Sequence, residues 1–176
     1  MNPYIAPRYV LISVVSIFLF TYCGAQTQDD SAIVKDFQAR VDKYMGLREK
    51  QHLLRQKRDV AGKIDDAHLT AHQGDIFTPA IAEYFKKQIE TTMRGSAGEK
   101  IRTSLRHAEP LTTVGLKANT KYPNNLPLQS TPPTLLLNLP LLPKALQYRI
   151  VGSTLLLYDV HSDLIVDLIP DAIATA

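Results

Sequence analysis

The positions of its prolines constrain the fold of this 176-residue chain more than any other feature. Seven of the 11 prolines lie between residues 109 and 144. Proline blocks regular helix and holds the residue before it in extended geometry, so this stretch is unsuited to a long helix or a central strand. It also contains runs such as Thr134-Leu135-Leu136-Leu137, and disordered linkers are poor in large aliphatic residues. We therefore predict that residues 109–145 form an extended strap that lies against other elements.

Before the strap, residues 26–108 show the spacing of amphipathic helices. Asp29, Asp30 and Ser31 offer N-cap oxygens at the start of a first helix, which we expect to run to about Arg58. Its apolar residues recur at helical intervals: Ile33, Val34, Phe37, Val41, Tyr44 and Met45.

A second helix has a sharper signature. Thr78-Pro79 combines an N-cap hydroxyl with a proline at the first helical position, and Gly95 is a natural C-terminal stop. Its apolar stripe consists of Ile81, Tyr84, Phe85, Ile89 and Met93. A short helix is expected from Glu99 to Arg106. The two longer helices predict a hairpin packed on its apolar stripes.

After the strap, residues 146–176 have the pattern of a small antiparallel sheet. Gln147–Val151 and Thr154–Val160 are strand-like, and Gly152-Ser153 between them suits a type II′ turn. This turn pairs Val151 with Thr154 and leaves apolar residues on both faces, so we expect each face to be covered. Leu164–Ile169 is expected to add a third strand. The chain as a whole predicts an α+β fold: a helical hairpin, a proline-rich strap and a sheet of two to three strands.

Residues 1–25 have the composition of a secretory signal peptide. Arg8 precedes an uncharged, mostly apolar run from Tyr9 to Tyr22, and Cys23-Gly24-Ala25 supplies the small residues of a cleavage site. We expect cleavage after Ala25 and a periplasmic or extracellular location. The alternatives are a retained N-terminal membrane segment and a lipid anchor at Cys23, the only cysteine.

Composition limits the chemistry of the mature chain. Without Cys23 it has no disulfide, thiol nucleophile or thiolate metal site. The net charge of +3 for the whole chain gives no reason to expect nucleic acid as a partner.

Three segments carry a resemblance to known families. Gly74-Asp75-Ile76-Phe77-Thr78-Pro79, Pro132-Pro133-Thr134-Leu135-Leu136 and the run from Leu146 to Ile173 resemble an uncharacterised family of exported bacterial proteins. That resemblance implies export and no assigned activity. The stretch from Tyr148 to Asp167 is also similar to the C-terminal β-unit of the periplasmic nickel/cobalt-homeostasis group, which implies a metal role, although this chain has no histidine-rich stretch.

His68 and His72, with Asp65, are the candidate metal ligands. On a helix their spacing would place all three on one side, and imidazole and carboxylate suit a divalent transition metal such as zinc or nickel. The alternative is a polar surface turn between helices. Asp159, His161 and Asp163 alternate in the same way, and for them we favour a polar turn over an ion site.

Two further stretches allow both a functional and a structural interpretation. The basic stretch of residues 48–58 is either the solvated end of a helix or a contact for anionic lipid headgroups. Gly95-Ser96-Ala97-Gly98-Glu99-Lys100 has the spacing of neither a phosphate loop nor a nucleophile elbow, so we interpret it as a helix end followed by a helix start.

The sequence therefore predicts an exported, non-enzymatic structural or interaction protein of the bacterial cell envelope, without a cofactor. Its expected partner is an unknown envelope protein or a second copy of the chain. The alternatives are a periplasmic metal-binding or metal-sensing protein and an enzyme acting on an envelope polymer. The last is disfavoured because no residues form a recognisable catalytic arrangement.

Overall fold

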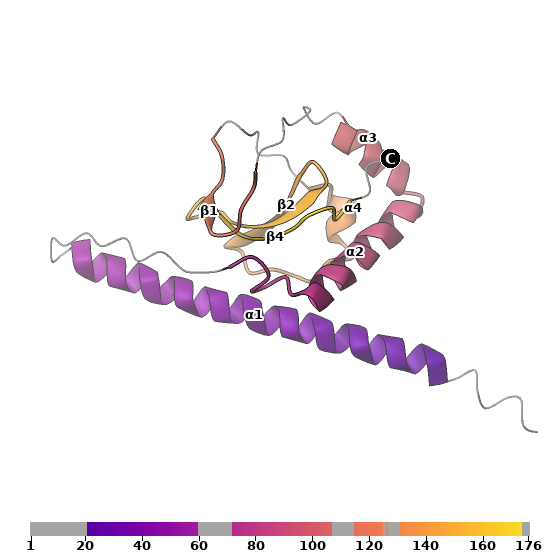
Figure 1. Cartoon of the computed structure of the whole chain (residues 1–176), viewed down its shortest axis with the longest axis horizontal. Coiled ribbons are helices and arrows are strands. Elements are labelled where there is room, and N and C mark those ends of the chain that lie inside the picture. Colours follow the sequence, from indigo (N-terminus) through magenta and orange to yellow (C-terminus); the bar gives the residue numbers. More distant parts are fainter. Residues whose placement is uncertain (1–20, 60–71, 107–114, 125, 127–130, 174–176) are drawn as a thin grey trace, which may run out of the picture. The chain divides into compact units, whose positions relative to one another are not determined.

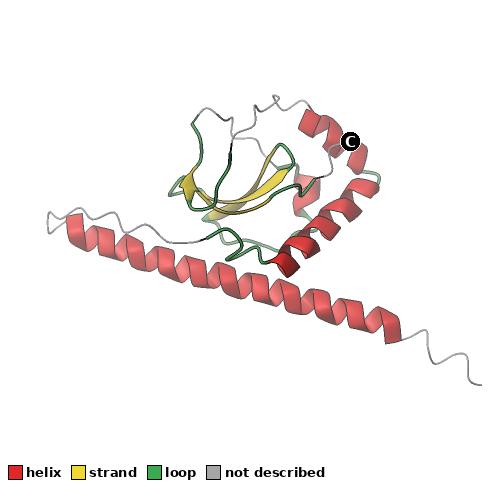
Figure 2. Ribbon diagram, in the orientation of Figure 1, coloured by secondary structure: helices red, strands yellow, loops and turns green. Residues whose placement is uncertain are grey.

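The computed structural model describes residues 21–59, 72–106, 115–124, 126 and 131–173. The chain divides into two compact units, residues 1–32 and residues 33–176. The described part of the first unit is helical, and the second unit holds the sheet and the hydrophobic core. Figure 1 labels the elements, and Figure 2 distinguishes helices from strands. They are α1 (Thr21–Asp59), α2 (Pro79–Arg94), α3 (Gly98–Arg106), β1 (Thr120–Lys121), α4 (Pro133–Leu136), β2 (Leu146–Val151), β3 (Thr154–Asp159) and β4 (Leu164–Ile169).

The predicted start of the first helix is wrong. α1 begins at Thr21 and passes through Asp29, Ser31 and Gly46 without a break. Residues 21–28 contain no proline, so no backbone constraint stops the helix before the acidic residues. Its end at Asp59 agrees with the expectation. Cleavage after Ala25, a residue within α1, stays a prediction.

The limits of α2 and α3 are as predicted. The Thr78 hydroxyl accepts the Ile81 N–H at 3.4 Å, Pro79 is the first helical residue, and Gly95 follows the last. The buried stripe of α2 consists of Ile81, Phe85, Ile89 and Met93.

Phe85 contacts Phe37 of α1, with ring centroids 5.1 Å apart. The two helices meet near the start of α2 and diverge from there (Figure 1), so the predicted hairpin packed along both apolar stripes is wrong. The sheet takes the place of the second helix, because the buried stripe of α2 packs in the same core cluster as Tyr148, Ile150, Leu155 and Leu157.

The sheet has four antiparallel strands in the order β1-β4-β3-β2. The predicted hairpin register is confirmed: Val151 pairs with Thr154. Gly152 has a φ of 61°, the left-handed geometry that the first position of a type II′ turn requires. The sequence predicts two to three strands, and the fourth is β1, in which Thr120 pairs with Ile165 of β4.

The strap is only partly extended. It supplies strand β1, and Pro133 opens the single helical turn of α4. The predicted extended course is interrupted at this turn, because the first helical position needs no N–H donor and so accepts Pro133. Pro132 before it keeps extended geometry, with a ψ of 128°.

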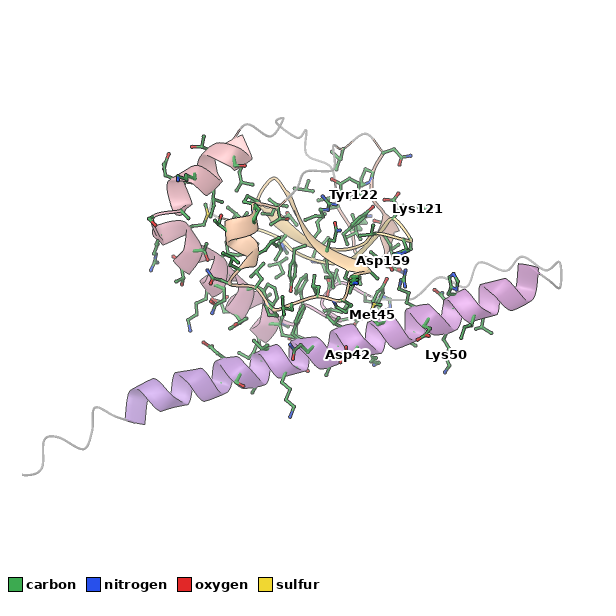
Figure 3. All side chains as sticks on the ribbon, turned by 180° about the vertical axis from the view of Figure 1, so that it is seen from behind. Asp42, Met45, Lys50, Lys121, Tyr122 and Asp159 are labelled. Atoms are coloured by element: carbon green, nitrogen blue, oxygen red, sulfur yellow. The ribbon has the colours of Figure 1, made fainter. Side chains whose placement is uncertain are left out.

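Both faces of the sheet are covered, as the apolar pattern predicts. On one face, Tyr148, Ile150, Leu155 and Leu157 join a core cluster with the helices, which includes Phe37, Ile81, Phe85, Ile89, Ile101 and Leu135. On the other face, Tyr122 and Leu126 cover Val151, Leu156, Tyr158, Ile165 and Leu168. Figure 3 shows Lys121 and Tyr122 beside the sheet, where β1 pairs with β4.

Within the described residues, none of the helices combines the length and the apolar character that crossing a bilayer requires.

Candidate functional site

A buried carboxylate fixes α1 to the sheet. Asp159, the last residue of β3, is completely buried. Its Oδ2 accepts the Tyr44 hydroxyl at 3.0 Å and the Arg48 Nε–H at 2.6 Å. Its Oδ1 accepts the N–H groups of His161 and Ser162 at 3.0 and 3.3 Å. Figure 3 shows Asp159 between the sheet and α1.

The ionisation of this cluster follows from its contacts. Burial alone raises the pKa of Asp159, but hydrogen bonds from Arg48, Ser162, His161 and Tyr44 outweigh it and leave the pKa below its ordinary value. Burial, followed by the Asp159 charge, raises the pKa of Tyr44, which stays neutral. At neutral pH the cluster therefore contains one carboxylate, one guanidinium and one phenol, and all three are held in mutual contacts.

A second buried carboxylate holds the loop that leads into α2. Asp167 of β4 is completely buried, and its oxygens accept the N–H groups of Gly74, Ile76 and Phe77 at 2.8–3.2 Å. It also accepts the N–H of Leu168 at 2.8 Å. Gly74 has a φ of 89°, which favours glycine at this position. The hydrogen bonds to Asp167 and the positive φ of Gly74 thus give the Gly74–Pro79 segment a structural role.

A β-bulge puts Asp167 in this place. Leu157 pairs with Asp167 and Tyr158 with Ile165, so β4 has one extra residue between these pairs. The bulge interrupts the alternation of side chains along β4. Ile165 and Leu168 belong to the cluster on one face, whereas Val166 and Ile169 belong to the cluster on the other.

The strap and β2 enclose an apolar groove, which we call the strap groove. It has a volume of about 450 Å³. Its lining residues come from both segments: Thr131, Leu136, Leu139, Pro140, Leu141, Leu142, Leu146, Gln147, Tyr148 and Arg149. Of these residues, Leu139 and Leu146 are buried, whereas Leu141 is 89% exposed. This arrangement suits the binding of an apolar side chain.

Hydrogen bonds hold the strap beside β2 at several points. The Thr131 hydroxyl donates to the Tyr148 carbonyl at 2.8 Å, and the Tyr148 hydroxyl donates to the Pro140 carbonyl at 2.9 Å. The Leu146 N–H donates to the Pro143 carbonyl at 2.9 Å. The groove lies between these fixed points, so contacts within the chain hold its walls in place.

The groove follows an edge of the sheet. β2 is the last strand in the sheet order, and no strand of the described residues pairs with its outer side. Because Val151 and Thr154 flank a two-residue turn, they form a hydrogen-bonded pair, and the pattern alternates from there. The peptide groups of Tyr148 and Ile150 therefore point to the outer edge, where the Tyr148 carbonyl accepts the Thr131 hydroxyl and Ile150 is buried.

The groove also carries one positive charge. Arg149 lies 5.7 Å from the centroid of the Tyr158 ring, and its Nη2 donates to Gln147 at 2.6 Å. This guanidinium makes an acidic group near the groove favourable.

Only one of the three candidate metal ligands belongs to the part of the chain that the structure describes. His68 and Asp65 lie outside the described residues. His72 is exposed in a non-helical stretch, and its N–H donates to Asp75 Oδ2 at 2.7 Å. Among the described residues, no group of three His, Cys, Asp or Glu side chains is arranged to hold a metal ion. The metal hypothesis stays a prediction.

The segment from Asp159 to Asp163 forms the polar turn that the sequence favours. Asp159 accepts backbone N–H groups of the turn, and Asp163 accepts the Tyr158 hydroxyl at 2.6 Å. The sequence did not reveal that Asp159 is buried against α1, because its partners Tyr44 and Arg48 are more than a hundred residues away. Residues 95–98 join α2 to α3, as predicted.

Comparison with protein-family models, with curated proteins and with solved structures gives no match. The fold and the groove therefore define the chain only as an α+β protein with a covered sheet and one edge beside an apolar groove.

Proposed function

We propose that this chain is an exported, non-enzymatic interaction protein of the bacterial cell envelope that binds an extended segment of a partner protein. The observation that carries the proposal is the strap groove beside the outer edge of β2. Export itself rests on the composition of residues 1–25.

The groove indicates the chemistry of the bound segment. A peptide in extended conformation that lies along the groove places an alternate side chain in it. Leu139, Leu141 and Leu146 favour an apolar side chain there. Arg149 favours a carboxylate on the same segment. We therefore propose an extended apolar segment with an acidic residue as the ligand.

The buried titratable groups support a binding role over a catalytic one. Asp159 and Asp167 are both engaged by donors within the chain, and neither lines the groove. A general acid or base must reach the proton that it transfers. Their contacts suit the fixing of two segments to the sheet.

The test is binding of the purified chain to an array of synthetic peptides in which Leu or Val alternates with Ser or Thr, with and without one Glu. We expect binding that is stronger for the Glu-containing peptides. Leu141→Glu should weaken it about tenfold or more, because one buried leucine side chain contributes about 1.5–3 kcal/mol.

Leu137→Glu is the matched control. Leu137 is 81% exposed in the same strap and does not line the groove. Equal loss in both variants, or no binding of any peptide, would contradict the proposal. Sedimentation of the same variants distinguishes a foreign segment from a second copy, because a dimer formed through the groove would dissociate with Leu141→Glu.

A further inference from the structure

The outer side of α1 carries a stripe of alternating lysine and leucine. Lys43, Leu47, Lys50 and Leu54 follow one another at intervals of four, three and four residues, which places them on one side of a helix. Leu53 lies beside them. Leu47, Leu53 and Leu54 are 47%, 51% and 47% exposed. We call these five residues the lysine–leucine stripe.

The stripe faces away from the core of the protein. The core side of α1 is defined by Phe37, Val41 and Tyr44, which are buried. Lys43 and Lys50 are exposed, and Figure 3 shows Lys50 on the side of α1 that is remote from the sheet. Three large leucines thus face solvent on a helix that already has another side in the core.

A shallow hollow lies within the stripe. It has a volume of about 400 Å³ and is lined by Lys43, Gly46, Leu47, Glu49, Lys50 and Leu53. A Cβ atom at Gly46 would meet no atom within 4 Å, so the helix surface is open at this position. The hollow is lined by the apolar side chains of Leu47 and Leu53, by two ammonium groups and by one carboxylate, that of Glu49.

Positive charge is concentrated in this part of the chain. Residues 43–58 contain six Lys or Arg and one Glu, a net charge of +5, whereas the whole chain carries +3. The remainder of the chain is therefore slightly acidic. A partner for this part of α1 should be negatively charged and should offer apolar contact as well.

We propose that the lysine–leucine stripe binds the surface of an anionic lipid membrane, with α1 lying along the interface. Leucine side chains enter the acyl boundary while the lysine ammonium groups extend to the phosphates. Lipid combines negative charge with an apolar layer, whereas nucleic acid offers no such layer to Leu53 and Leu54. A second copy fits poorly, because two surfaces of like net charge repel each other. This proposal is independent of the strap groove.

A tryptophan reporter tests the proposal on the full chain. The chain contains no tryptophan, so Leu54→Trp introduces a single indole into the stripe. We expect its emission to shift to the blue with vesicles of phosphatidylcholine and phosphatidylglycerol. Little shift is expected with phosphatidylcholine alone. Leu137→Trp, in the strap, is the matched reporter and should not shift with either vesicle.

Charge variants give the second measurement. Lys43→Glu with Lys50→Glu in the Leu54→Trp chain should reduce the affinity for phosphatidylglycerol vesicles at least about tenfold. Lys100→Glu with Lys117→Glu makes the same change of charge at exposed positions outside α1 and should have a much smaller effect. The residues before α1 are identical in all these chains, so their own membrane affinity does not affect the comparison.

Three results would overturn the proposal. The first is an indole emission in the Leu54→Trp chain that does not respond to phosphatidylglycerol vesicles. The second is an equal loss of affinity in the two double variants, which would show an effect of net charge alone. The third is the same blue shift with soluble polyphosphate, which would assign the stripe to anion binding without a lipid layer.

Discussion

Asp159→Asn is the substitution from which the structure predicts the largest consequence for α1. Asparagine retains one oxygen to accept the N–H groups of His161 and Ser162. Its amide nitrogen replaces the oxygen that accepts the Tyr44 hydroxyl and the Arg48 Nε–H. The Arg48 Nε–H then faces another donor and the guanidinium loses its counter-charge, whereas the Tyr44 hydroxyl can turn and accept from the amide.

The magnitude follows from the burial of the two partners. Removing one member of a buried ion pair costs about 3–5 kcal/mol. The Asp159 side chain is fully buried, but that of Arg48 is 24% exposed and can turn toward water, so we expect the lower end, about 3 kcal/mol. Total stabilities of small domains are about 5–15 kcal/mol. The variant should therefore remain folded at 25 °C with a much reduced free energy of unfolding.

Urea denaturation monitored by circular dichroism measures this effect. A loss of about 3 kcal/mol moves the midpoint by roughly 1–3 M urea. Asp163→Asn is the control in the same turn: its φ of 53° suits asparagine, and it accepts one hydroxyl, so its cost should stay below about 1 kcal/mol. Asp159→Asn within about 1 kcal/mol of the wild type would refute the assigned role, as would an equal cost in the two variants.

Two further predictions concern the buried carboxylates. Asp167→Asn should lower the free energy of unfolding by about 2–4 kcal/mol, because an amide cannot accept all the N–H groups of the Gly74–Phe77 loop. Faster proteolysis within this loop would show that the effect is local. An unchanged midpoint of urea denaturation would contradict the prediction. The pH dependence tests Asp159 separately. Since its folded pKa lies below the ordinary value of 3.8, its contribution is complete above that value and is lost as the pH falls through the folded pKa. The difference between the wild type and Asp159→Asn should thus be constant near neutral pH and shrink in acid, and a difference that grows in acid would show the opposite shift.

Local patterns predicted the elements whose signals are complete within a few residues. Thr78-Pro79 and Gly95 delimit α2, and Gly152-Ser153 sets the register of β2 and β3. These signals operate through backbone geometry and neighbouring hydrogen bonds, which do not depend on the remainder of the fold. Because the turn sets the register of β2 and β3, the side chains on each face of this β-hairpin could be assigned, and they belong to two separate clusters.

The features that sequence reasoning missed depend on distant contacts. Strict alternation along β4 would put Asp167 on the same face as Ile165, and only the bulge changes this. β1 consists of two residues in the strap and exists because it pairs with β4. The strap groove likewise requires the position of the strap beside β2, which follows from the Tyr148 bonds to Thr131 and Pro140.

The two buried aspartates make the long-range contacts of the sheet, and these contacts affect the two proposed binding surfaces differently. β2, β3 and β4 pair with their neighbours in sequence, whereas Asp159 and Asp167 reach partners about a hundred residues away in α1 and in the loop before α2. Contacts of such separation cost more chain entropy to form than the hairpins do. The strap groove depends on β2 and the strap, whereas the orientation of the lysine–leucine stripe depends on Asp159. Weakening the Asp159 cluster should therefore change how α1 is presented to a membrane while the groove keeps its shape.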